Sequence, residues 1–313
     1  MPQKLYYLIV LFFLLLVFVV GFLFFTDSAG ETEQNVVATQ EQNKLSQAFI
    51  LPLAESSYFP LRDFNIVEPV IDAKSALLFD TRSGKLLYQK DAFRQLPIAS
   101  LTKLMTAVVI IENLNLDSII TVSAENLNVD GFGADLVRGE KLKGVDLLKI
   151  MLIKSSNDAA LVFQSYAQTQ GIDLVEKMNQ KAADLGMNGT NFTNPAGLDD
   201  DASSTAVDLV KLVQYIGGHR LIWQILTIPS IEVTSADGAH VHNIVNTDRL
   251  LGQVPDIVGG KTGFTDKALG TMILVINIDR GFSNLIGVVL GSNDRFNDVR
   301  KLIEWGKEAY RWR

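Results

Sequence analysis

The chain of 313 residues contains no cysteine and has more acidic than basic residues. Without cysteine it can form no disulfide, no thiolate nucleophile and no cysteine-ligated zinc site. Its 35 Asp and Glu against 28 Lys and Arg give a formal net charge of -7. Proteins that coat nucleic acid need a basic face to neutralise phosphates, so we expect no nucleic-acid partner. The length allows one large domain or two modest ones.

Histidine is also scarce, with three residues in the whole chain. His240 and His242 alternate as they would on a strand, and His219 is remote from them in the sequence. A zinc site needs several ligands that converge on one point, so this pattern favours a surface pair over a metal site. We expect no metal and no cofactor.

One segment, Leu5–Phe25, lacks charge altogether, and Gly21 is its one non-apolar member. At about 1.5 Å per residue, a helix over this run spans roughly 30 Å, the thickness of a bilayer's hydrocarbon core. We expect residues 1–25 to form an uncleaved transmembrane anchor. A cleaved signal peptide is the alternative, although its apolar region is usually only about 7 to 15 residues long. Lys4 precedes the run and Asp27 follows it, so the positive-inside rule places the rest of the chain outside the cytoplasm.

Residues 26–69 are expected to form a flexible tether and a lead-in to the domain. Up to about Leu45 the segment is rich in Glu, Gln, Asn, Thr and Ala, and such a stretch buries too little surface to offset its ordering entropy. The segment from Gln47 to Pro69 is more apolar but contains three prolines. We therefore place the start of the folded domain near Val70, with residues 70–313 as one domain.

The hydrophobic pattern of this domain runs from two strands through a block of helices to two more strands and a terminal helix. This order predicts a sheet whose first and last strands are neighbours, with the helical block inserted between them. The expected strands are Ser75–Asp80 and Leu86–Gln89, joined as a hairpin, and Leu269–Asp279 and Phe282–Leu290, joined by a turn at Arg280–Gly281. The expected helices are Leu101–Leu114, Val145–Leu152, Ala159–Thr169, Leu174–Leu185, Ala206–Ile216 and Val299–Arg311.

Ser100–Lys103 forms a Ser-x-x-Lys motif just after Pro97. Because it opens an apolar helical pattern, Ser100 is expected in the first turn of a helix and Lys103 on the same face one turn later. A serine hydroxyl is a poor nucleophile until a neighbour takes its proton, and a neutral lysine amine can do so. The helix N-terminus also favours developing negative charge. Taken alone, the motif is more often an ordinary helix start with a surface lysine.

Ser155–Asn157 forms a Ser-x-Asn motif between two expected helices. Residues two apart do not share a helix face, so Ser155 and Asn157 can point the same way only if the backbone bends there. Ser155 could then relay a proton toward a leaving amine, and Asn157 could hold a substrate amide. A capped turn between two helices is an equally good interpretation of this motif alone.

Gly259–Thr265, with the sequence Gly-Gly-Lys-Thr-Gly-Phe-Thr, is expected as a loop that leads into the strand at Leu269. Its glycines would let a substrate backbone lie close to a strand edge, and Lys261 and Thr262 could bind a carboxylate. A phosphate-binding loop would need a glycine at position 255, where the chain has Pro255, and would lead into a helix.

In this order, the three motifs resemble the signature set of the penicillin-recognising serine enzymes. The sequence is similar to the D-alanyl-D-alanine carboxypeptidases, the low-molecular-mass penicillin-binding proteins, from about Val70 to Gly306. The resemblance rests on Pro97–Thr106, Ser155–Ala159, Gly197–Asp199 and Gly259–Thr265. It implies an α/β (α+β) domain of the β-lactamase/transpeptidase-like fold, in which helices flank an antiparallel sheet and an all-helical subdomain is inserted.

The resemblance also implies a role for each matching residue. Ser100 would attack the terminal D-Ala–D-Ala bond of peptidoglycan stem peptides and would be acylated by β-lactams, with Lys103 as the base. Ser155 and Asn157 would line the cleft and assist proton transfer. Lys261 and Thr262 would bind the terminal carboxylate, with Arg295 near it, and Gly263 and Phe264 would complete the substrate-binding set. The backbone N–H groups of Ser100 and Phe264 would form the oxyanion hole. Arg249 does not fall on a family arginine. The enzyme would be anchored in the bacterial cell membrane, with its catalytic domain on the extracytoplasmic side.

Three alternatives stay open. A class A β-lactamase shares the motifs but needs a Glu-x-x-x-Asn loop, and no glutamate occurs between Glu176 and Glu232. A DD-endopeptidase acting on peptidoglycan crosslinks would use the same residues with a different cleft. A catalytically silent wall-binding protein would not need the intact Ser100, Lys103 and Lys261.

Overall fold

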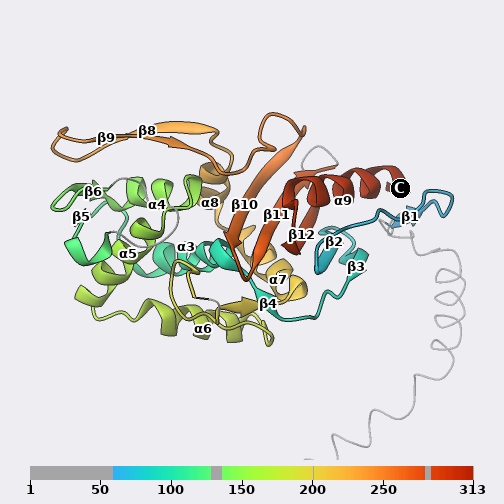
Figure 1. The fold of residues 1–313 in the computed structure, drawn as a ribbon, viewed down its shortest axis with the longest axis horizontal. Coiled ribbons are helices and arrows are strands. Elements are labelled where there is room, and N and C mark those ends of the chain that lie inside the picture. The colour runs from blue at the N-terminus through green and yellow to red at the C-terminus, as the bar shows by residue number, and fades with distance from the viewer. Residues whose placement is uncertain (1–58, 128–135, 200, 279–282, 313) are drawn as a thin grey trace, which may run out of the picture. The chain divides into compact units, whose positions relative to one another are not determined.

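The computed structural model describes residues 59–127, 136–199, 201–278 and 283–312 (Figure 1). Its main sheet has five strands, which are β2 (Ser75–Asp80), β3 (Lys85–Lys90), β10 (Ile257–Thr265), β11 (Leu269–Asn277) and β12 (Asn284–Ser292). All neighbours are antiparallel, in the order β10-β11-β12-β2-β3. The pairing of β12 with β2, with Val288 opposite Leu77, confirms that the first and last expected strands are neighbours.

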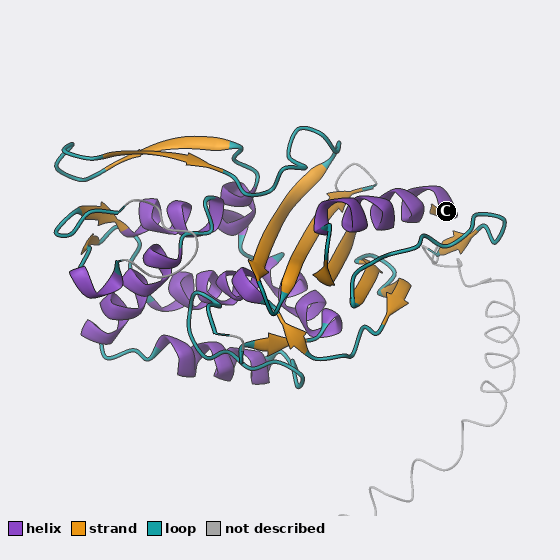
Figure 2. Ribbon diagram, in the orientation of Figure 1, coloured by secondary structure: helices purple, strands orange, loops and turns teal. Residues whose placement is uncertain are grey.

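Helices cover both faces of this sheet (Figure 2). On one face Leu78 and Val289 pack against α9 (Arg295–Ala309). On the other face Leu77 and Val288 join the core of the helical block, where α7 (Ala206–Ile216) contacts β2 and β12 and α8 (Arg220–Leu226) contacts β10. Because both faces are covered, β2 and β12 are almost wholly buried and their sequences are continuous apolar runs.

The inserted helical block lies between β3 and β10 in the chain. Besides α7 and α8 it contains α3 (Thr102–Asn113), α4 (Gly144–Ile153), α5 (Asn157–Thr169) and α6 (Leu174–Asp184). α3 is its central helix, buried continuously from Thr102 to Ile110 because α4, α5, α6 and α7 all contact it. A 3-10 turn, η1 (Ala99–Leu101), precedes α3 and contacts β10 and β11. The block thus holds the start of α3 against the edge of the sheet.

Side-chain caps determine where several helices begin. Ser156 Oγ accepts the N–H of Ala159 at the start of α5, and the side chains of Asp173 and Thr205 cap α6 and α7 in the same way. The last helix begins at Arg295, four residues before the expected Val299, because the Asp294 side chain accepts the N–H of Asn297. The expected positions of α3 to α7 agree with the structure within one or two residues at each end.

Short strands and one short helix were not expected from the sequence, because two to five residues carry too little periodicity to be recognised. Three two-stranded sheets pair β4 (Leu96–Pro97) with β7 (Ser203–Ser204), β5 (Ile119–Thr121) with β6 (Lys141–Lys143), and β8 (Ser230–Thr234) with β9 (Val241–Val245). α8 was missed as well. The expected turn at Arg280–Gly281 lies outside the described residues.

The folded domain begins earlier than the expected Val70. β1 (Pro60–Arg62) pairs with β13 (Tyr310–Trp312), and the N–H of Asp63 donates to the carbonyl of Ala309. The partly buried Ile66 packs on the core beneath α9. These residues are ordered by the far end of the chain, which a reading of the local sequence could not reveal.

The expected anchor and most of the expected tether, residues 1–58, lie outside the described residues. Within the described part of the chain, no helix is both long enough and apolar enough to cross a membrane.

Candidate active site

Ser100 lies in η1, directly before α3. Its neighbour Ala99 has a φ of 49°, in the left-handed region that non-glycine residues rarely adopt. Gly197, at a φ of 71°, lies so close to this turn that a Cβ there would overlap the carbonyl oxygen of Ala99. Strained backbone of this kind persists only where the surrounding structure imposes it. The turn presents Ser100, which is 9% exposed, at the junction between helix and sheet.

Lys103 is wholly buried one turn after Ser100, and its Nζ lies 2.9 Å from Ser100 Oγ. The same Nζ donates to Asn157 Oδ1 at 2.7 Å and to the carbonyl of Ala196 at 2.6 Å. A neutral amine has two hydrogens and one lone pair. If those two acceptors take the hydrogens, the lone pair is left to face the hydroxyl of Ser100. Local helix geometry thus brings the pair together as expected, but the acceptors that orient the amine come from elsewhere in the chain.

The electrostatic surroundings of Lys103 favour this neutral form. Burial lowers the pKa of Lys103 well below its usual value, because the ammonium form loses its hydration, and the positive charge of Lys261 lowers it further. A lysine with a strongly lowered pKa can accept a proton near neutral pH.

The Ser-x-Asn motif connects the two lysines. α4 ends at Ile153 and Ser155 has a φ of 60°, which is the backbone bend that the sequence required. Ser155 Oγ accepts a hydrogen bond of 2.7 Å from Lys261 Nζ, while Asn157 accepts one from Lys103. A hydroxyl between Lys261 and the cleft can pass a proton between groups on its two sides.

The Gly259–Thr265 segment is part of strand β10 and not the loop that we expected. Pairing along β11 makes it a regular edge strand of the sheet, with Lys261 opposite Ile273. Gly263 faces the nucleophile, since a Cβ at this position would lie 2.9 Å from the backbone nitrogen of Ser100. Phe264 follows it and is half exposed, at 50%. The strand edge therefore lies directly against the turn that carries Ser100.

Lys261 is buried, at 1% exposure, and its pKa is lowered from 10.5 to about 7. Burial is the main cause, the positive charge of Arg295 adds to it, and the negative charge of Asp248 opposes both. Thr262 is the next residue on the strand, and its Oγ1 donates to Thr247 Oγ1 at 2.7 Å. The ammonium of Lys261 and the hydroxyl of Ser155 that it contacts are groups that can bind a carboxylate.

Arg295 is the first residue of α9 and not, as expected, a loop residue ahead of it. Its side chain lies against Gly270, and its guanidinium stacks over Phe296 at 4.8 Å from the ring centroid. The pKa of Arg295 is lowered by burial and then by the charge of Arg249. The positive charge of Arg295 acts on Lys261, whose pKa it helps to lower.

Several site residues were missed from the sequence. Asn194 Oδ1 accepts the N–H groups of Ala196 and Gly197, which fixes the loop whose carbonyl binds Lys103. Thr247 and Asp248 come from the segment between β9 and β10. The Asn-Pro-x-Gly sequence at 194–197 indicates a turn, but nothing in it indicates contact with a lysine some 90 residues earlier.

The expectation of a surface histidine pair is wrong for His242. This residue is buried, and its Nε2 lies 2.6 Å from Glu140 Oε1, so it links β9 to the segment before β6. Among the described residues, no group of three or more His, Asp or Glu side chains lies close enough to hold a metal ion.

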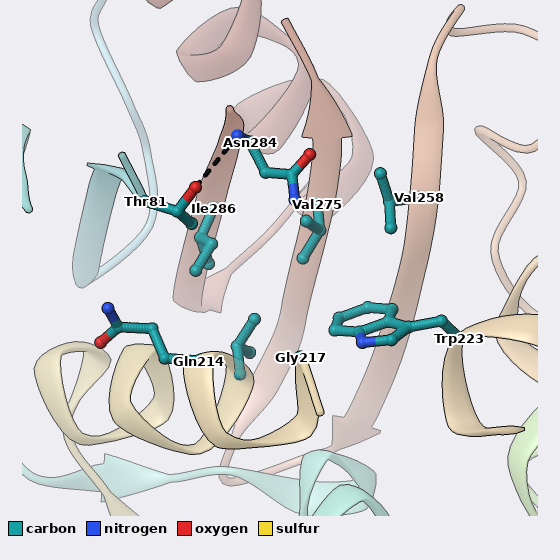
Figure 3. Close-up of a pocket in the computed structure, with 9 residues that line it drawn as sticks. Thr81, Gln214, Gly217, Trp223, Val258, Val275, Asn284 and Ile286 are labelled. Carbon is teal, nitrogen blue, oxygen red and sulfur yellow. Dashed lines mark hydrogen bonds between the residues drawn. The ribbon is translucent and has the colours of Figure 1, made fainter. Parts of the chain in front are cut away.

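A separate half-open cavity of about 380 Å³ lies between α7, α8 and the sheet (Figure 3). The indole of Trp223 and the side chains of Val258, Val275 and Ile286 line it. It lies toward the start of β10, away from Ser100, and none of the nine expected site residues lines it. We therefore place the chemistry at the η1–β10 junction.

A serine beside a desolvated lysine, facing a strand edge that carries a second buried lysine, is the arrangement of a serine enzyme that works by acyl transfer. The chain belongs to the D-alanyl-D-alanine carboxypeptidase family of serine peptidases, whose family model matches residues 63–294. It is 29% identical over 270 residues to the D-alanyl-D-alanine carboxypeptidase DacF of Bacillus subtilis, covering 83% of this chain and 69% of that protein. It is 32% identical over 236 residues to a D-alanyl-D-alanine endopeptidase of Pseudomonas aeruginosa, covering 74% of this chain and 76% of that protein.

The fold comparison agrees with the sequence comparison. A penicillin-binding protein of Listeria monocytogenes, solved in its ampicillin-bound form, superposes with a TM-score of 0.67 at 31% identity. The match covers 77% of this chain and 99% of that one. The expected transpeptidase-like fold and the expected enzyme family are therefore confirmed.

Proposed function

We propose that this enzyme is a serine-type D-Ala–D-Ala carboxypeptidase that removes the terminal D-Ala from peptidoglycan stem peptides through an acyl-enzyme on Ser100. The observation that carries the proposal is the arrangement of Lys103. Its Nζ lies 2.9 Å from Ser100 Oγ and has acceptors in Asn157 and Ala196 for its two hydrogens. This geometry provides a base aimed at one hydroxyl.

In the first half of the reaction, Ser100 Oγ forms a bond to the carbonyl carbon of the penultimate D-Ala, and its proton moves to Lys103. The backbone N–H groups of Ser100 and Phe264 would stabilise the oxyanion, which the close approach of Gly263 to Ser100 supports. The bond to the terminal D-Ala nitrogen then breaks, and the leaving amine takes a proton through Ser155. In the second half, water attacks the acyl-enzyme ester, releases the shortened peptide and regenerates Ser100.

Recognition of the terminal carboxylate would fall to Lys261, Thr262 and Arg295. Lys261 would supply an ammonium and Thr262 a hydroxyl, both from β10. Arg295 adds positive charge from α9. A β-lactam carries a comparable carboxylate beside a strained amide, so it should acylate Ser100. The ampicillin-bound relative supports this expectation.

The test is the release of D-Ala from a stem peptide that ends in D-Ala–D-Ala, followed by mass spectrometry with the full-length protein in detergent. The Ser100→Ala protein is the matched control and should release none. Because one relative is an endopeptidase, a crosslinked dimer of two stem peptides is assayed in parallel. Faster cleavage of the crosslink than of the terminal D-Ala would replace our proposal with the endopeptidase activity.

The lifetime of the penicilloyl-enzyme distinguishes a carboxypeptidase from a β-lactamase. Since no glutamate occurs between Glu176 and Glu232 to activate water in a Glu-x-x-x-Asn loop, the penicilloyl-enzyme on Ser100 should persist. Fluorescent penicillin should label the wild type and not the Ser100→Ala protein. Rapid hydrolysis of excess penicillin would assign the protein to the β-lactamases, and absence of labelling would favour a silent wall-binding protein.

We also propose that Leu5–Phe25 is retained as a single-pass membrane anchor, with the catalytic domain outside the cytoplasm. The length of this run and the change from Lys4 to Asp27 across it support the proposal. The intact protein should stay with membranes after a high-salt wash and keep an N-terminus at or near Met1. A mature N-terminus near Gly30, found by mass spectrometry, would indicate a cleaved signal peptide instead.

A further inference from the structure

Asp248 is a buried carboxylate directly behind the strand that carries Lys261. It lies between β9 and β10 and is 3% exposed. Its Oδ1 accepts the N–H of Leu250 at 2.9 Å. Its Oδ2 lies against Gly260, so closely that a Cβ at Gly260 would overlap it. The glycine before Lys261 therefore makes room for a carboxylate.

This carboxylate has fewer hydrogen-bond partners than a buried charge usually needs. Oδ2 has no hydrogen-bond partner among the described residues. Burial raises the pKa of Asp248, which means that its ionised form is held at a cost in free energy. An asparagine would keep the bond to Leu250 without a buried charge, so stability of the fold does not account for an acidic residue at this position.

The charges around Asp248 give it a different role. Lys261 on β10 lies in the field of the cationic Arg295 on α9, and Arg249 beside Asp248 adds a second positive charge near Arg295. Both charges disfavour another positive charge in the cleft. Asp248 is the negative group whose charge favours the ammonium form of Lys261.

We propose that Asp248 is a positioning residue for substrate recognition, whose carboxylate behind Gly260 keeps Lys261 protonated so that it can bind the substrate's terminal carboxylate. The inference rests on the proposed carboxypeptidase function, because it assigns Lys261 to that carboxylate. Asp248 itself touches no substrate. Its effect should therefore appear at the pH where Lys261 loses its proton and should disappear where Lys261 is fully charged.

The test compares the pH profile of kcat/KM for the wild type and the Asp248→Asn protein on a peptide ending in D-Ala–D-Ala. The charge of Asp248 favours the ammonium form of Lys261, so its removal should move the alkaline limb to lower pH, by about one unit for a nearby opposite charge. At pH 8 this corresponds to a loss of up to about tenfold in kcat/KM, carried by KM. At pH 6 the two proteins should agree within about twofold.

Two controls distinguish charge from structure. Asp256→Asn removes a charge from an exposed position of the same segment and should leave the profile unchanged. A peptide ending in D-alaninamide offers Lys261 no carboxylate, so its alkaline limb should be the same in wild type and Asp248→Asn. If Asp248→Asn does not fold, Asp248→Ser also removes the charge and keeps an oxygen that can accept the N–H of Leu250.

An unchanged alkaline limb in a folded Asp248 variant would overturn the inference and leave the carboxypeptidase function intact. If the wild type releases no D-Ala, the proposed function fails. The role of Asp248 is then measured from the pH profile of acylation by fluorescent penicillin, which also carries a carboxylate. The same shift in that profile would support the inference, and its absence would overturn it.

Discussion

Replacing Lys103 with arginine tests whether this residue acts as the base. At pH 7 an ordinary lysine with a pKa of about 10.4 is neutral in roughly one molecule in 2,500. Burial and the charge of Lys261 lower the pKa of Lys103 well below that value, so a larger fraction can accept the Ser100 proton. Arginine, with a pKa above about 12, would be neutral in fewer than about one molecule in 100,000. Since general bases contribute about 10²- to 10⁴-fold to rates, Lys103→Arg should lose acylation by that factor.

The assay is the second-order rate of labelling by fluorescent penicillin, with circular dichroism to check the fold. Lys261→Arg is the matched comparison, because Lys261 is also buried but is needed for its charge, which arginine keeps. Its loss should be about tenfold or less. Lys103→Met, which is close to lysine in shape and has no proton to exchange, should fail like Lys103→Arg and covers the case in which the larger arginine does not fit. Near-normal labelling of a folded Lys103→Arg protein would mean that another group takes the proton.

Three further predictions concern stability. Gly197→Ala should lower the free energy of unfolding in urea by about 1–3 kcal/mol, because its φ of 71° and the nearby carbonyl of Ala99 exclude a Cβ. An unchanged unfolding midpoint would contradict the close contact between Gly197 and Ala99. His242→Ala should lower the free energy of unfolding by about 1–3 kcal/mol, because it leaves the buried Glu140 oxygen without its hydrogen-bond partner. A double variant that also replaces Glu140 with glutamine should recover part of this loss. The pKa of Lys261 is about 7 in the folded protein against 10.5 for an exposed lysine, so the unfolded chain binds more protons between these values and this group makes stability rise with pH across that range. Lys261→Met should therefore show a smaller rise of Tm between pH 7 and pH 10 than the wild type, and an equal rise would refute the lowered pKa.

The sequence by itself determined the chemistry and the plan of the fold. Ser100 and Lys103 are one helical turn apart, so local geometry alone brings them together. The bend at Ser155 was required by the spacing of its motif and is present as a positive φ. Continuous apolar runs identified the buried strands, because a strand covered on both faces has apolar residues at successive positions. Helical periodicity of the apolar residues identified the inserted helices.

Only the tertiary structure decided how these parts become a site. The acceptors that orient Lys103 lie 54 and 93 residues away, at Asn157 and Ala196, and Lys261 reaches Ser155 across 106 residues. Such contacts depend on how helices pack on a sheet, which local periodicity does not encode. For the same reason the Gly259–Thr265 segment resembled a loop, since its glycines weaken the strand pattern and only pairing with β11 makes it an edge strand. The position of Asp248 behind the strand of Lys261 was likewise decided by the tertiary structure. The electrostatic effect of a buried charge depends on its neighbours, which the fold brings together.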